Sequence, residues 1–345
     1  MPIGLHRRRG AAAALLTLLL AAGIGPRCAQ AAPKEESVRR WVATLRANPA
    51  DNAAREALRR LFTEEYPVRL PHDVLEYLPI PYRACADAFP GERALQRSFF
   101  TTGLAFPDAA HRSDPEGHLY NRVLYAYAQE EEGEWSLCFR VLYNHRDEGA
   151  EALAPRTTRA LLAVRAAHVA MLGLTSPVLS RPLDAWLRPD GDGGAGQSGV
   201  NLFFLGTAAH RDPVELLRQA AHEFGHAALP PVGPLQSPEE WGNGFLGEAL
   251  YLRWLSRASA GSDPPAPPEE LGAYVRHQID PLARAFAITG WNGLAGQEKS
   301  VGGLRLLLGM VLNLEDKRGP GAVAGLFRNV RGGTLPEWIA AAPAE

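Results

Sequence analysis

The chain has 345 residues, of which 46% are hydrophobic, 21% charged and 8% aromatic, and its formal net charge is −2. This composition is that of an ordinary folded protein, and it excludes a disordered, fibrous or coiled-coil chain. The near-neutral charge, with no long basic stretch beyond the N-terminus, argues against nucleic acid as a partner. The length allows two domains or one large one.

Residues 1–31 have the features of a signal peptide. A short basic segment at 6–9 precedes an apolar run at 11–24, and Ala31 ends a stretch of small residues that a signal peptidase accepts. The apolar run is shorter than the roughly 20 residues that a membrane span needs. We therefore predict an exported protein, periplasmic or extracellular, with no stable membrane span after cleavage. An uncleaved signal anchor is the alternative.

The mature chain would keep two cysteines, Cys85 and Cys138. Exported proteins retain disulfides, but two cysteines are too few for a disulfide scaffold or a cysteine-based zinc site. One bridge between them and two separate buried thiols both remain open, because pairing requires the two Cα atoms to lie within about 7 Å.

Residues 32–134 are predicted to form an N-terminal region that is helical and irregular. Apolar residues at helical spacing predict a hairpin of two helices over 37–65, with its turn at 48–51, similar to one tetratricopeptide repeat. No second copy follows, so the hairpin is not part of a repeat array. It either packs on the next domain or docks a partner.

Residues 135–260 are predicted to form an α+β core, and residues 261–345 a helical C-terminal subdomain. Asp212 is a good N-cap for the last core helix. The core elements, in chain order, are a strand at 135–143, a helix at 156–172, strands at 182–187 and 199–205, and a helix at 213–229. The C-terminal helices are expected near 269–287, 302–314 and 322–330.

The segment His-Glu-Phe-Gly-His at 222–226 indicates metal chemistry. His222 and His226 lie one turn apart on one face of the predicted helix, so both imidazoles can reach one Zn²⁺. Glu223 is adjacent, close enough to act on a zinc-bound water without being a ligand. The alternative is an ordinary helix that carries two surface or core histidines.

A third ligand is expected downstream on another helix, and Glu248 is our candidate. It lies in an otherwise apolar segment, where a lone carboxylate is costly unless it is paired or metal-bound. Glu239 and Glu240 are competitors, but Pro238 and the glycine-rich residues 241–244 place them in a loop.

These residues make the chain, from about residue 135 to its end, resemble the gluzincin metallopeptidases, the HExxH…E clan that includes thermolysin-like enzymes. The resemblance implies a zincin-like catalytic domain in which the strand at 200–205 is the sheet edge that pairs with an extended peptide substrate. The family usually has Trp-x-x-Glu-Gly near its ligand glutamate. Here Trp241 is followed by Gly242-Asn243-Gly244, and Glu248 comes four residues later.

The resemblance further implies a zinc-dependent metallopeptidase, with Glu223 as the general base. In this family a tyrosine or histidine stabilises the oxyanion, and the candidates are Tyr251, Tyr274 and His277. Arg276 and Arg305 are candidates to meet a substrate carboxylate. Two alternatives stay open: a catalytically inactive zincin-fold binding or scaffold protein, and a zinc hydrolase of a non-peptide amide such as a cell-wall component. The oligomeric state is open as well.

Overall fold

The computed structural model describes residues 33–64, 67–78, 82–84, 99–105, 112–129, 134–173, 177–233, 241–258, 264–290 and 301–342. The predicted signal peptide, Cys85, Glu239 and Glu240 therefore lie outside the described residues. Within the described ranges, no helix has both the length and the apolar character needed to cross a membrane.

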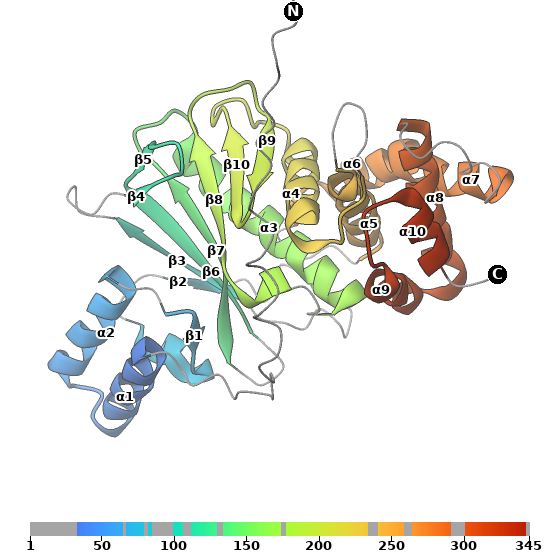
Figure 1. Cartoon of the computed structure of the whole chain (residues 1–345). Coiled ribbons are helices and arrows are strands. Elements are labelled where there is room, and N and C mark those ends of the chain that lie inside the picture. The colour runs from blue at the N-terminus through green and yellow to red at the C-terminus, as the bar shows by residue number, and fades with distance from the viewer. Residues whose placement is uncertain are drawn as a thin grey trace, which may run out of the picture.

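A mixed sheet forms the centre of the molecule (Figure 1). Its strand order is β2-β3-β6-β7-β8-β10-β9, and β1 pairs with the start of β7. Strands β7, β8 and β10 are parallel to one another, whereas the remaining ladders are antiparallel. A small separate ladder joins β4 and β5. The bounds are β1 Arg69–Leu70, β2 Tyr82–Ala84, β3 Phe99–Ala105, β4 Arg112–Ser113, β5 Leu119–Tyr120, β6 Arg122–Gln129, β7 Trp135–Tyr143, β8 Leu183–Arg188, β9 Ala195–Ser198 and β10 Asn201–Leu205.

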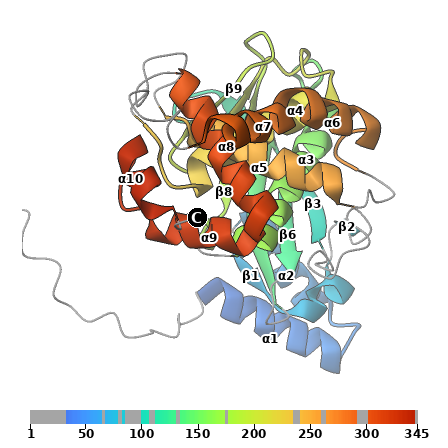
Figure 2. The same cartoon turned by 90° about the vertical axis from the view of Figure 1, so that its right-hand side faces the viewer.

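Helices cover both faces of the sheet. The N-terminal hairpin packs on one face, while α3, α4 and α5 lie on the other, with the C-terminal helices beyond them (Figures 1 and 2). A turn of π-helix at Val275–Ile279 joins α6 to α7. The bounds are α1 Pro33–Ala47, α2 Asn52–Glu64, α3 Ala150–Leu172, α4 Pro213–Ala228, α5 Asn243–Arg257, α6 Pro268–Tyr274, α7 Asp280–Thr289, α8 Val301–Arg318, α9 Pro320–Asn329 and α10 Leu335–Ala341.

The α+β class is confirmed, and several elements lie where the sequence predicts them. The N-terminal helical hairpin is present as α1 and α2, and β7 has the predicted bounds. The motif helix is α4, and the Asp212 carboxylate accepts hydrogen bonds from the backbone N–H groups of Val214 and Glu215 at 2.8 and 3.3 Å. Helix α3 begins six residues earlier than expected, at Ala150 rather than Arg156.

The region 32–134 differs from the expectation that it is only helical and irregular, because it supplies β1, β2, β3 and β6 to the sheet. The boundary at 134/135 falls between β6 and β7, which pair along their length. On β6, Tyr125 and Tyr127 pack under the N-terminal hairpin, whereas Ala126 and Ala128 face α3. A strand buried on both faces shows no alternation of apolar and polar residues, so its sequence carries little strand signal.

The strand before the motif helix is not the edge of the sheet, which corrects the expectation for residues 200–205. Strand β10 pairs with β8 on one side and with β9 on the other. The chain turns back at Gly199, which has φ of +59°, a conformation that glycine adopts without strain. The strand at this edge of the sheet is therefore β9, which was missed because its residues, Ala-Gly-Gln-Ser, have low strand propensity.

Helices α4 and α5 approach each other closely at two glycines. A Cβ atom on Gly225 would lie 2.7 Å from the carbonyl oxygen of Asn243, and one on Gly247 would lie 2.6 Å from the Cα of Gly225. These neighbours are backbone atoms, which cannot move aside as the end of a side chain can. Both positions therefore require glycine while the helices keep this separation.

Replacing Gly225 or Gly247 by Ala should lower the free energy of unfolding by roughly 1–3 kcal/mol, because the added methyl group forces the two helices apart. The matched control is Gly321→Ala in α9, where an added Cβ meets no atom within 4 Å. Urea denaturation of the three variants checks this. Equal midpoints for the Gly247→Ala and Gly321→Ala variants would show that the two helices are not held by this contact.

Candidate metal centre

The two motif histidines converge on one point of the neighbouring helix. Their rings lie with centroids 4.9 Å apart in a T-shaped arrangement. A Cβ atom on Gly244, in the first turn of α5, would lie 2.5 Å from Nε2 of His226 and 2.6 Å from Nε2 of His222. Both Nε2 atoms thus face the same small space beside the α5 backbone.

The Nδ1 atoms of the same rings are held by two side chains of α5. Nδ1 of His226 donates to the amide oxygen of Asn243 at 2.8 Å, and Nδ1 of His222 donates to Glu248 in a longer bond of 3.4 Å. The Asn243 amide nitrogen donates in turn to the carbonyls of His226 and Leu229, which fixes the amide orientation. Because both acceptors are oxygens that only accept, the protons lie on Nδ1, and each Nε2 carries the lone pair through which an imidazole binds a metal.

Glu248 is buried and accepts hydrogen bonds from three side chains. Its Oε2 accepts from Arg218 at 3.0 Å and from His222, while its Oε1 accepts from the Tyr274 hydroxyl at 2.5 Å. Burial raises the pKa of Glu248, but the hydrogen bond from His222 and the charge of Arg218 outweigh burial and hold that pKa below its ordinary value. Glu248 is therefore a buried, ionised carboxylate.

Arg218 lies one helical turn before His222 and links two carboxylates. It forms a bidentate pair with Glu215, at 2.6 and 2.7 Å, in addition to its bond to Glu248. A planar guanidinium in such a fork keeps its geometry better than an ammonium group would. Arg218 thus ties α4 to the carboxylate that holds His222.

The residues fit a metal in part. The two imidazoles present Nε2 atoms to one space that a Cβ on Gly244 would fill, as a pair of Zn²⁺ ligands requires. Glu248, expected as the third ligand, lies against the Nδ1 edge of His222, the edge opposite the shared space. Among the residues that the structure describes, no three His, Cys, Asp or Glu side chains form a metal-binding group.

Glu223, the expected base, is buried on α4 between the two histidines, with 7% of its surface exposed. In the sequence of α4, Glu223 directly follows His222 and precedes Phe224, whose side chain packs in the core.

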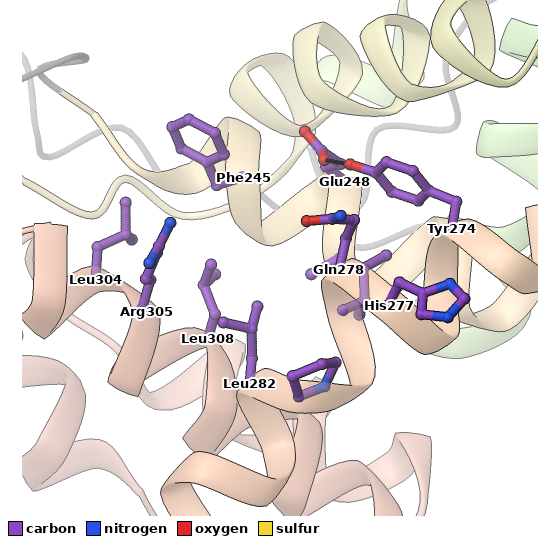
Figure 3. Close-up of a pocket in the computed structure, with 12 residues that line it drawn as sticks. Phe245, Glu248, Tyr274, His277, Gln278, Leu282, Leu304, Arg305 and Leu308 are labelled. Atoms are coloured by element: carbon purple, nitrogen blue, oxygen red, sulfur yellow. Dashed lines mark hydrogen bonds between the residues drawn. The ribbon is translucent and has the colours of Figure 1, made fainter.

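A cavity of about 470 Å³ adjoins the Glu248 side of the centre. Figure 3 shows the Tyr274 hydroxyl meeting the Glu248 carboxylate at its rim. Most of the lining is apolar, including Phe245, whose ring packs edge-on against His222 with centroids 4.7 Å apart. The lining comprises Phe245, Glu248, Ala249, Tyr274, His277, Gln278, Ile279, Pro281, Leu282, Leu304, Arg305 and Leu308.

The structure separates the three oxyanion candidates. The Tyr274 hydroxyl is bonded to Glu248, so this residue belongs to the centre. His277 lines the cavity, but it is exposed and its Nδ1 donates to the carbonyl of Ala273. Tyr251 is fully buried, and its hydroxyl is hydrogen-bonded to Nδ1 of His168 at 2.9 Å, in the core behind α4. Of the two arginine candidates, Arg305 lines the cavity and Arg276 does not.

Three contributors to the centre were missed at the level of sequence: Asn243, Gly244 and Arg218. Arg218 precedes His222 by four residues, so helical spacing alone could have placed it on the same face. Asn243 and Gly244 carried no such signal, because their role depends on how α5 crosses α4.

A bridge between Cys85 and Cys138 and two separate buried thiols both stay predictions. The thiol of Cys138 is buried and donates a hydrogen bond to the carbonyl of Ser136 at 3.3 Å. Cys85 lies outside the described residues.

Comparison of the chain with models of protein families found no match, and no curated protein matched it either.

The buried His168 should make stability depend on pH. Burial, followed by the charge of Arg165, lowers the pKa of His168 to about 4, from an ordinary value of 6.5. The unfolded chain therefore binds a proton between pH 6.5 and 4 that the folded chain does not. Stability from this group is complete above pH 6.5, and about 3 kcal/mol is lost as the pH falls to 4.

Replacing His168 with Gln keeps a hydrogen-bond partner for Tyr251 but removes the titration. Urea denaturation at several pH values should show a shallower loss of stability between pH 6.5 and 4 in this variant than in the unmodified protein. Parallel pH profiles for the two proteins would mean that His168 does not titrate in this way.

Proposed function

We propose that this protein is an exported, zinc-dependent hydrolase of peptide bonds with a zincin-like catalytic domain. The observation that carries the proposal is the convergence of the two Nε2 atoms of His222 and His226 beside Gly244, with each Nδ1 proton held by a side chain of α5. Histidine ligands typically donate their second ring nitrogen to a carboxylate or carbonyl, and here both do so to oxygen acceptors.

The chain's own residues then take defined roles. His222 and His226 would hold Zn²⁺ through Nε2, and the bound ion would supply Lewis acidity toward a water and a substrate carbonyl. Glu223 accepts the proton of the attacking water and delivers it to the leaving amine. Glu248 and Asn243 keep the two imidazoles in the tautomer that can bind a metal.

Two features support an extended peptide as the substrate. Strand β9 is an antiparallel edge of the sheet that lies against α4. The Gln219 amide of α4 donates to the carbonyl of Gly193, in the loop just before β9, at 2.5 Å. A peptide can add to such an edge through main-chain hydrogen bonds. The cavity beside Phe245 has room for an apolar side chain, with Arg305 available for a carboxylate.

A second candidate is a zincin-fold binding or scaffold protein without hydrolytic activity. The observation in its favour is that α5 faces the two Nε2 atoms with a glycine, not with a side chain that could be a ligand. A panel of peptide and acyl-amide substrates separates the proposed peptidase from a zinc hydrolase of a non-peptide amide.

Glu223→Gln should bind zinc as the unmodified protein does and lose peptide hydrolysis by about 10²- to 10⁴-fold, because an amide cannot accept the proton of water. The measurement is peptide turnover at full zinc occupancy, with Glu151→Gln as the matched control, because Glu151 is an exposed residue in the first turn of α3.

Hydrolysis that survives Glu223→Gln would refute the proposed mechanism. Zinc bound through His222 and His226, but no turnover of any peptide by the unmodified protein, would establish the second candidate in its place.

A further inference from the structure

Helix α5 meets the two edges of the His222 ring in different ways. Nδ1 faces the Glu248 carboxylate at 3.4 Å, and Nε2 faces the backbone of Gly244, where a Cβ would lie 2.6 Å away. Residues 244 and 248 lie one turn apart on the same face of α5. Glu248 thus accepts the proton of Nδ1, whereas Gly244, one turn earlier in α5, faces Nε2, the nitrogen that would bind a metal.

The bonds of Glu248 keep it on the Nδ1 side. Both carboxylate oxygens are already used, Oε1 by Tyr274 and Oε2 by Arg218 and His222. To become a ligand of a metal on Nε2, the carboxylate would have to leave the Arg218 guanidinium, whose side chain is 27% exposed, and pass to the opposite edge of the ring. The Glu248 side chain itself is only 11% exposed, so water would replace few of the hydrogen bonds that the carboxylate gives up, and the observed arrangement is favoured.

We infer that α5 supplies no metal ligand: Glu248 is a positioning residue that holds the Nδ1 proton of His222, and Gly244 stands where a third protein ligand would face both Nε2 atoms. This inference rests on the proposed function and sharpens it. Zn²⁺ at this centre has two protein ligands from the described residues, where catalytic zinc sites usually have three. The described residues thus fill two of the four positions of a tetrahedral ion.

The first experiment separates positioning from ligation at Glu248. In Glu248→Gln, the amide oxygen can take the place of Oε2 and accept from His222 and Arg218, while the amide nitrogen donates to the Tyr274 oxygen. Zinc affinity should therefore change by less than about tenfold, and Glu248→Ala should lose about 10- to 100-fold, as for other partners of ligand histidines. The visible spectrum of the Co²⁺-loaded Gln variant should match that of the unmodified protein, because the ligand set is the same.

The second experiment adds a carboxylate at position 244, on the side of α5 that faces both Nε2 atoms. Gly244→Asp and Gly244→Glu are compared with Gly244→Ala, which adds the same Cβ without a carboxylate. The alanine variant should bind zinc more weakly than the unmodified protein, because its methyl group occupies the space between the Nε2 atoms. The better carboxylate variant should bind at least about tenfold more tightly than the alanine variant. Thermal melts of all variants establish that each is folded.

The outcomes separate this inference from the proposed function. A Glu248→Gln variant that loses zinc as severely as Glu248→Ala, with an altered cobalt spectrum, makes Glu248 a ligand and overturns the inference. So does the lack of any gain from a carboxylate at position 244. Zinc binding that persists in His222→Ala and His226→Ala instead refutes the proposed function. Zinc bound only by a Gly244 carboxylate variant supports the inference while the proposed function fails.

Discussion

The backbone contact between α4 and α5 at Gly225 and Gly247 is the constraint on which the candidate centre depends. It brings the first turn of α5 against the face of α4 that carries His222 and His226. With larger residues at these positions the helices would stand further apart, and neither Asn243 nor Glu248 could reach the imidazoles. The sheet and α3 form the base on which this helix pair is held, through a core that includes Phe224.

The charged groups around this contact form one connected set. Glu248 is buried at the crossing, and a carboxylate there is costly unless donors surround it. Arg218 from α4, Tyr274 from α6 and His222 from the motif provide those donors, so three helices meet at one side chain. The same bonds that stabilise the carboxylate also select the Nδ1-protonated form of His222. The hydrogen bonds that stabilise the buried carboxylate are thus the same ones that orient the His222 ring.

The parts of the molecule that sequence reasoning predicted correctly are those with local signals. Helix α4 was placed by its Asp212 cap and its apolar periodicity, and β7 by its aromatic and β-branched residues. Strand β6 was missed because it is buried on both faces, and β9 because it is short and rich in small residues. Such strands are defined by their partners in the sheet, which one sequence does not reveal.

The candidate site shows the same division. The helical spacing of His222 and His226 is local, and it correctly predicts that the two rings share a face. Glu248 is expected as the third ligand because it is a carboxylate in an apolar segment. In the structure it is buried among three hydrogen-bond donors, and the edge of the His222 ring that it meets is set by the crossing of α4 and α5. The role of Gly244 depends on that same crossing. A glycine adds no side chain to a sequence pattern, so the sequence alone does not indicate this role.

The most direct test of the metal centre is the position of zinc in crystals of the protein, located by anomalous scattering at the zinc edge. The account predicts one peak about 2.0–2.1 Å from Nε2 of both His222 and His226, with Glu248 still bonded to Nδ1 of His222. A zinc ion bound to the Glu248 carboxylate would contradict the assignment of α5. Crystals grown in excess zinc that show no peak at the two imidazoles would contradict the metal centre itself.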